Sequence, residues 1–137
     1  MAEGLLQARL GHRPGFQVSS AGVAALVGEP ADPLAVALMA ARGIDISAHR
    51  ARQATPDLLY ASDLVLVMEK EHEKEVHGIA FEARGKVHRI GRFGDFDVLD
   101  PYRQGLAAFE KALALLDRGI ADFEKAIWTS PSRKVDG

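Results

Sequence analysis

Cysteine is missing from all 137 residues of the sequence. Within this chain, the absence excludes disulfide bonds, thiolate metal sites and a cysteine nucleophile. Long apolar runs are missing too, since no segment approaches the roughly 20 residues of a membrane-spanning helix. The first residues lack the basic and apolar regions of a secretory signal. We therefore expect a cytoplasmic protein.

The sequence also has little excess charge. Its formal net charge is -2, and no long run of Lys or Arg is present, which argues against nucleic acid or an anionic membrane surface as a partner. Apolar residues make up 47%, enough for the core of one domain. We expect a single domain over 1–128. The apolar pattern is lost after Trp128, so 129–137 is predicted to be a flexible tail.

What the sequence does contain is an alternation of helical and strand patterns, which is typical of an α/β fold with a parallel sheet. Helices are predicted over 1–10, 32–43, 70–78 and 103–128, with a shorter one starting at 55–57, and strands over 16–20, 64–68 and 87–90. The run at 64–68 is apolar on both faces, as in a buried parallel strand. In a doubly wound sheet the first strand is usually central. No strand pattern precedes the first helix, so we expect the central strand to be missing from this sequence.

Short motifs along the chain occur in a characteristic order. They are Met1-Ala2-Glu3, Ser20-Ala21-Gly22, Ala31-Asp32-Pro33, His49-Arg50-Ala51-Arg52-Gln53, Val67-Met68-Glu69 and Asp100-Pro101-Tyr102-Arg103. This ordered set resembles the low-molecular-weight protein tyrosine phosphatases, especially bacterial members linked to polysaccharide export. The resemblance implies a flavodoxin-like, doubly wound parallel sheet. In that family the first strand leads into a C-x5-R-S-P phosphate loop, and the sequence begins where the following helix would start.

The resemblance also implies roles for single residues. Asp100 matches the general acid, a group that contributes about 10²–10⁴-fold to such reactions. Tyr102 and Leu26 match positions that wall the phosphotyrosine ring. Ser20 and His49 match residues that brace the phosphate loop, and without that loop both are expected to lack a partner. On the Asp-Pro dipeptide alone, a residue that starts a turn or caps the final helix is strongly favoured over a catalytic acid.

Two functional hypotheses follow. In the first, this is a phosphotyrosine phosphatase domain whose true start lies upstream, so the chain as written is inactive because the nucleophile and loop are absent. In the second, the chain is a non-catalytic pseudophosphatase that acts as a binding or oligomerising module. The expected partner is a phosphotyrosine protein, such as a tyrosine kinase of polysaccharide export, or a small aryl phosphate.

Two further expectations concern the sheet and metals. A missing central strand would leave unpaired backbone groups in the neighbouring strands, and each buried unpaired group costs about 1–3 kcal/mol of stability. We therefore predict that 16–20 pairs directly with 64–68, or that another copy fills the gap and forms a homo-oligomer. His72 and His77 are five residues apart, which turns their side chains about 100° away from the i, i+4 zinc geometry. No metal or cofactor is predicted.

Overall fold

The computed structural model describes residues 1–11, 13–22 and 27–128. Its elements are α1 (Ala2–Leu10), α2 (Pro33–Ala40), α3 (Pro56–Ala61), β1 (Val65–Val67), α4 (Lys70–Ile79), the 3₁₀ helix η1 (Phe81–Lys86), β2 (Val87–Arg89), the 3₁₀ helix η2 (Arg92–Gly94) and α5 (Leu106–Ala126). All five predicted helices and two of the three predicted strands are present. The predicted tail lies outside the described residues.

Two helices begin with the same device. The Asp32 carboxylate accepts a hydrogen bond from the Leu34 amide at 2.8 Å, and the Thr55 hydroxyl accepts one from the Leu58 amide at 3.3 Å. In each case proline follows the capping residue and occupies the first helical position, where its missing N–H costs nothing. The helix starts read from the sequence are therefore confirmed.

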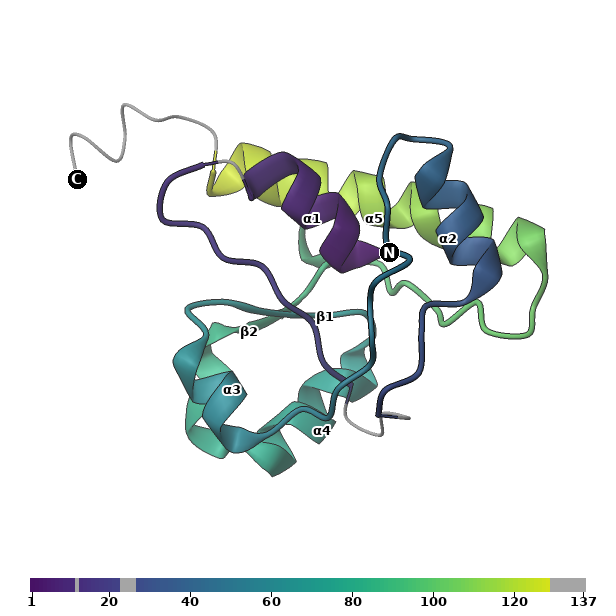
Figure 1. Ribbon diagram of the computed structural model, residues 1–137. Helices are drawn as coiled ribbons and strands as arrows, with labels where there is room; N and C mark the ends of the chain where they lie inside the picture. Colours follow the sequence, from purple (N-terminus) through teal and green to yellow (C-terminus); the bar gives the residue numbers. More distant parts are fainter. Residues whose placement is uncertain (12, 23–26, 129–137) are drawn as a thin grey trace.

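The sheet of the described residues consists of β1 and β2, which run parallel with Val65 opposite Val87. The Ile90 amide extends this ladder by donating to the Val67 carbonyl at 2.8 Å. Figure 1 shows α1, α2 and α5 on one side of the two strands and α3 and α4 on the other. Helices on both faces of a parallel sheet confirm the α/β class.

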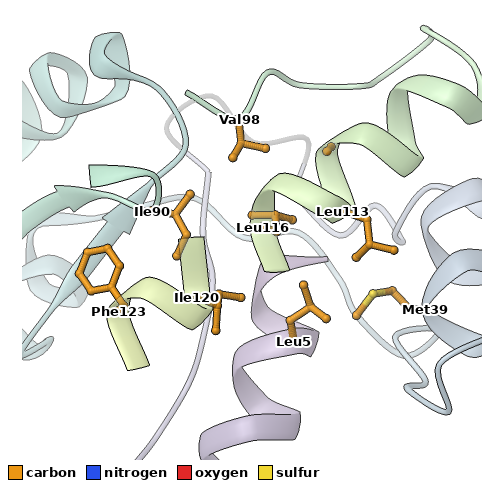
Figure 2. Packing of buried hydrophobic residues seen from close by; sticks show 9 residues of the cluster. Leu5, Met39, Ile90, Val98, Leu113, Leu116, Ile120 and Phe123 are labelled. Atoms are coloured by element: carbon orange, nitrogen blue, oxygen red, sulfur yellow. The ribbon is translucent and has the colours of Figure 1, made fainter. Parts of the chain in front are cut away.

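The core has one part on each side of the sheet. The larger cluster joins α1, α2 and α5, and Figure 2 shows its side chains converging. Its buried members are Leu5, Met39, Ile90, Val98, Ala112, Leu113, Leu116, Ile120 and Phe123. The smaller cluster, on the α3 and α4 side, contains Leu59, Val67, Val76, Ala80, Ala83 and Val87. The two strands are therefore covered on both faces by apolar side chains.

The strand predicted over 16–20 does not form. Burial still alternates along it as it would in a strand: Phe16, Val18 and Ser20 are half-buried, whereas Gln17 and Ser19 are exposed. A strand also needs backbone hydrogen bonds to a neighbour, and the described residues include no ladder partner for this segment. The predicted direct pairing of 16–20 with 64–68 is therefore wrong.

No helix in the described part of the chain is both long and apolar enough to cross a lipid bilayer.

Candidate functional site

A cavity of about 870 Å³ opens at the carboxyl end of β1. Its walls come from the first turn of α1, the segment after α2, the end of β1 and the loop that leads to α5. Ser20, His49 and Asp100, which are far apart in the sequence, all line it. The carboxyl ends of parallel strands are where α/β proteins bind their ligands, so this cavity is the candidate site.

A second hollow of about 550 Å³ shares these three residues with the first. Tyr102 and Arg52 also line it, so it lies on the side of the site where the Tyr102 ring is found. The structure thus brings together four of the five residues that the sequence singled out. The fifth, Leu26, lies outside the described residues.

Ser20 and His49 meet at Glu3, a residue that sequence reasoning did not select. The Ser20 hydroxyl donates to Glu3 Oε1 at 2.5 Å, and His49 Nδ1 lies 3.9 Å from the same oxygen. The Arg52 Nε–H donates to the Ser20 carbonyl at 2.9 Å and fixes the backbone there. The expectation that Ser20 and His49 lack a partner is therefore wrong, because an acidic side chain in the first turn of α1 takes that place.

Asp100 lies on an exposed loop and bonds to its own backbone. Its carboxylate accepts a hydrogen bond from the Tyr102 amide at 3.0 Å, the arrangement of an Asx turn. The following helix starts only at Leu106, so Asp100 does not cap it. One carboxylate oxygen thus serves the turn, and the carboxyl group as a whole stays at the cavity wall.

Tyr102 projects from the same loop, with half of its surface exposed. The Arg103 guanidinium carbon lies 5.1 Å from the centre of the Tyr102 ring, a cation–π distance. Arg103 itself has a φ of 62°, in the left-handed region that few non-glycine residues adopt. The turn therefore presents an aromatic face and a cation beside the Asp100 carboxylate.

The loop before Asp100 is anchored by Arg89 at the end of β2. The Arg89 guanidinium donates to Asp95 at 2.7 Å and to Asp97 at 2.8 Å. The hydrogen bond from Arg89 to Asp95, followed by the positive charge of Arg89, holds the pKa of the Asp95 carboxyl below its ordinary value. Next along the chain, the buried Val98 donates its amide to the Met68 carbonyl at 2.9 Å. Asp100 therefore follows a segment that is fixed at three points.

His72, which also lines the cavity, is occupied in a helix cap. Its Nδ1 accepts a hydrogen bond from the Glu69 amide at 3.2 Å, while the Glu69 side chain caps the first turn of α4. This reciprocal arrangement is a capping box in which histidine replaces the usual Glu or Gln. The role of His72 in the structure is thus to start α4 at the end of β1.

Comparison with known proteins settles the family. The family model "Low molecular weight phosphotyrosine protein phosphatase" matches residues 1–132. The chain belongs to the low-molecular-weight protein tyrosine phosphatase family. The resemblance inferred from the ordered motifs is therefore confirmed.

Individual members of this family are similar over most of the chain. The probable low-molecular-weight protein-tyrosine-phosphatase EpsP of Ralstonia nicotianae is 48% identical over 120 residues, covering 88% of this chain and 81% of the relative. The phosphatase Etp of Escherichia coli K12 is 38% identical over 128 residues, covering 93% and 84%. Both are bacterial phosphatases of the type that the sequence indicates.

A solved structure agrees with the fold. Vibrio vulnificus Wzb, solved in complex with benzylphosphonate, superposes with a TM-score of 0.85 at 39% identity. The match covers 92% of this chain and 88% of Wzb. The described elements therefore have the arrangement found in this phosphatase family.

Proposed function

We propose that this chain forms the body of a phosphotyrosine monoester hydrolase in which Asp100 is the general acid. The observation that carries the proposal is that Asp100, Ser20 and His49 line one cavity at the carboxyl end of β1. Asp100 protonates the oxygen of the leaving phenolate and then activates the water of the second step. Tyr102 contacts the aromatic ring of the substrate, and Leu26, outside the described residues, is proposed to do the same.

Ser20 and His49 are proposed to position the phosphate-binding elements of the site. In this chain their shared partner is Glu3, whose carboxylate joins α1 to both residues. A carboxylate at this place repels a phosphate dianion at short range. We therefore propose a structural role for Ser20 and His49: through Glu3, they hold the first turn of α1 against the segment around His49.

The chain as written is proposed to be inactive toward aryl phosphates by the cysteine mechanism. That mechanism needs a thiolate and a cradle of amides or guanidinium for the phosphate, and the sequence contains no cysteine. Hydrolysis of p-nitrophenyl phosphate should therefore be undetectable for the 137-residue chain. A version extended with the residues encoded upstream should be active if they supply a cysteine loop. Activity of the shorter chain would overturn the proposed mechanism.

The role of Asp100 is tested in that extended version. Asp100→Asn should lower kcat by about 10²–10⁴-fold, with KM much less affected, because only proton transfer to the leaving group is lost. Asp63→Asn, which changes an exposed carboxylate outside the cavity lining, is the matched control and should keep full activity. Equal activity of the two variants would remove Asp100 from the mechanism.

A second candidate function is a non-catalytic phosphotyrosine-binding or oligomerising module. The observation that favours it is that the acid-loop turn and the Ser20 cluster are intact in a chain without the nucleophile. The partner proposed for either function is a phosphotyrosine protein, such as a tyrosine kinase of polysaccharide export. Saturable binding of a phosphotyrosine peptide, but not of its unphosphorylated form, would support the module. Absence of binding would reject it.

A further inference from the structure

Arg89 connects the end of β2 to two carboxylates of the loop that follows it. Its backbone lies in the parallel ladder opposite Val67, and only 11% of its side chain is exposed. One guanidinium nitrogen lies 2.7 Å from Asp95 Oδ1, and the other lies 2.8 Å from Asp97 Oδ1. The planar fork of arginine binds two acceptors in a fixed geometry, which the single ammonium of lysine does not. Arg89 therefore ties this loop to a strand whose own position is fixed by the sheet.

The segment that Arg89 holds has little freedom of its own. Asp95 has a φ of 52°, in the left-handed region, and its amide donates to the Arg92 carbonyl at 3.3 Å. Between the two aspartates, the centre of the Phe96 ring lies 5.0 Å from the guanidinium carbon of Arg118 in α5, a cation–π distance. The turn that Arg89 closes is therefore held against both β2 and α5.

Among the described residues, the loop that carries Asp100 makes no hydrogen bond to the walls of the cavity. We call residues 99–104 the acid loop. The hydrogen bonds described for it are internal: the Tyr102 amide donates to the Asp100 carboxylate at 3.0 Å, and the Gln104 amide donates to the Pro101 carbonyl at 2.9 Å. The place of Asp100 relative to the cavity is therefore set chiefly by the points at which the acid loop begins and ends.

The beginning of the acid loop is the end that Arg89 controls. Asp97 is bound by Arg89, and the next residue, Val98, donates its amide to the main chain just beyond β1 at 2.9 Å. The Val98 side chain is also buried in the larger core cluster, as Figure 2 shows. Only Leu99, with 65% of its surface exposed, lies between this fixed segment and Asp100. A shift of Asp97 would therefore pass to Asp100 with little to absorb it.

We propose that Arg89 is a positioning residue for Asp100: by binding Asp95 and Asp97, it fixes the start of the acid loop and keeps the Asp100 carboxyl at the cavity wall. The inference rests on the proposed role of Asp100 as the general acid. Such an acid acts only within hydrogen-bond reach of the leaving oxygen, and a misplacement of about 1 Å costs up to roughly 10²-fold in rate. The described lining of the cavity does not include Arg89, so its effect is exerted through the acid loop.

The first measurement is made on the 137-residue chain. Backbone nitrogen relaxation reports the order of the acid loop in the unaltered chain and in Arg89→Met, which keeps a long side chain but removes both ion pairs. The order parameters of Tyr102 and Arg103 should fall toward those of flexible backbone, below about 0.6. Arg42→Met is the matched control, because it removes an equally short ion pair, to Asp117 at 2.6 Å, that joins the end of α2 to α5. The control should leave the acid loop unchanged.

The second measurement compares two esters in the extended version. The leaving group of phenyl phosphate needs a proton, whereas that of 2,4-dinitrophenyl phosphate is stable as an anion. Arg89→Met should lower kcat/KM for phenyl phosphate by about 10–10²-fold, and that for the dinitrophenyl ester much less. Added to Asp100→Asn, Arg89→Met should cause little further loss, because the group that Arg89 positions is already gone. Arg42→Met should lower neither rate.

Each result either supports the positioning role or overturns it. An equally ordered acid loop in Arg89→Met would overturn it, and so would equal losses for the two esters or additive losses in the double variant, since general damage to the fold produces both. Asp97→Asn weakens the anchor from its other side and should repeat the results on a smaller scale even where Arg89→Met fails to fold. Full activity of Asp100→Asn, or an inactive extended version, would refute the proposed function and the positioning role with it, whereas failure of the loop measurement alone refutes only the positioning role.

Discussion

The two edges of β1 differ in how they are completed. On the β2 side, backbone hydrogen bonds, the fully buried Ile90 and the Arg89 anchor join strand, loop and α5 into one unit. The segment 16–20, which we predicted to pair directly with β1, keeps a strand-like alternation of burial without a ladder. Alternating burial therefore follows from side-chain packing alone, whereas a strand also requires a neighbour.

The largest predicted difference between the two sides concerns stability. Phe123 has no exposed surface, and its ring lies 4.9 Å from that of Phe93. Phe123→Ala should lower the free energy of unfolding by about 3–5 kcal/mol because it leaves a cavity in the larger cluster. Val18→Ala, in the unpaired segment, should cost about 1 kcal/mol or less. Urea unfolding followed by circular dichroism measures both, and equal losses would contradict the comparison.

A pair of glycines tests how closely the β2 side is packed. A Cβ added at Gly119 would lie 2.5 Å from the Ile90 carbonyl oxygen, which is backbone and has little freedom to move. Gly119→Ala should therefore cost about 1–3 kcal/mol through overpacking. Gly78 in α4 has open space around it, so Gly78→Ala should instead stabilise the chain by about 0.5–1 kcal/mol. The same unfolding measurement applies, and a stabilising Gly119→Ala would show that α5 is not held against Ile90.

The Arg89 anchor should appear in the acid dependence of stability. The Asp95 pKa is held below its ordinary value of 3.8, first by the hydrogen bond from Arg89 and then by the charge of Arg89. Because the folded-state pKa is the lower one, the contribution is complete above pH 3.8 and is lost as the pH falls through the folded value. Arg89→Met should flatten this acid limb, as measured by urea midpoints over a pH series. An unchanged acid limb would mean that the anchor adds no stability.

The smallest predicted effect concerns His88 in β2. Burial first, and the neighbouring Arg92 second, lower its pKa from the ordinary 6.5. The unfolded chain then binds more protons near neutral pH, so stability should fall as the pH drops below 6.5 toward the folded-state value. His88→Gln should remove that slope, whereas His77→Gln, on α4, is the control. If His77→Gln removed the pH dependence of stability and His88→Gln did not, the slope would come from His77 and the prediction would be wrong.

Much of this fold could be predicted from the sequence because its signals are local. Asp32-Pro33 and Thr55-Pro56 each place a capping oxygen and a preset backbone angle at a helix start, and no distant contact is needed to interpret them. The 64–68 run likewise indicates a buried strand from its own composition. The segment 16–20 has an equally clear local pattern, but its strand state depends on a neighbour that no local pattern reports.

The residues of the candidate site show the same difference: local signals could be recognised in the sequence, whereas long-range contacts could not. Asp100 and Tyr102 were found because the motif keeps them two residues apart on one loop. Glu3 was missed because its role depends on contacts 17 and 46 residues away, the differences between position 3 and positions 20 and 49. Its one sequence signal was its place in the first turn of α1, where acidic residues are favoured for helix stability alone. Because helix stability already explains an acidic residue at this position, nothing in the sequence indicated the contacts of Glu3 with Ser20 and His49.

The two ends of the described chain are tied to each other. Arg9 and Arg13, at the end of α1 and just beyond it, both bind Glu124 near the end of α5, and Arg13 also donates to the Trp128 carbonyl. Contacts of such long sequence separation form late, because the intervening chain must first be ordered. During synthesis, α1 emerges from the ribosome before α5 and cannot make these contacts until α5 has been made. Of these two helices, the one that is translated earlier therefore lacks its ion-pair partner until the later one has been made.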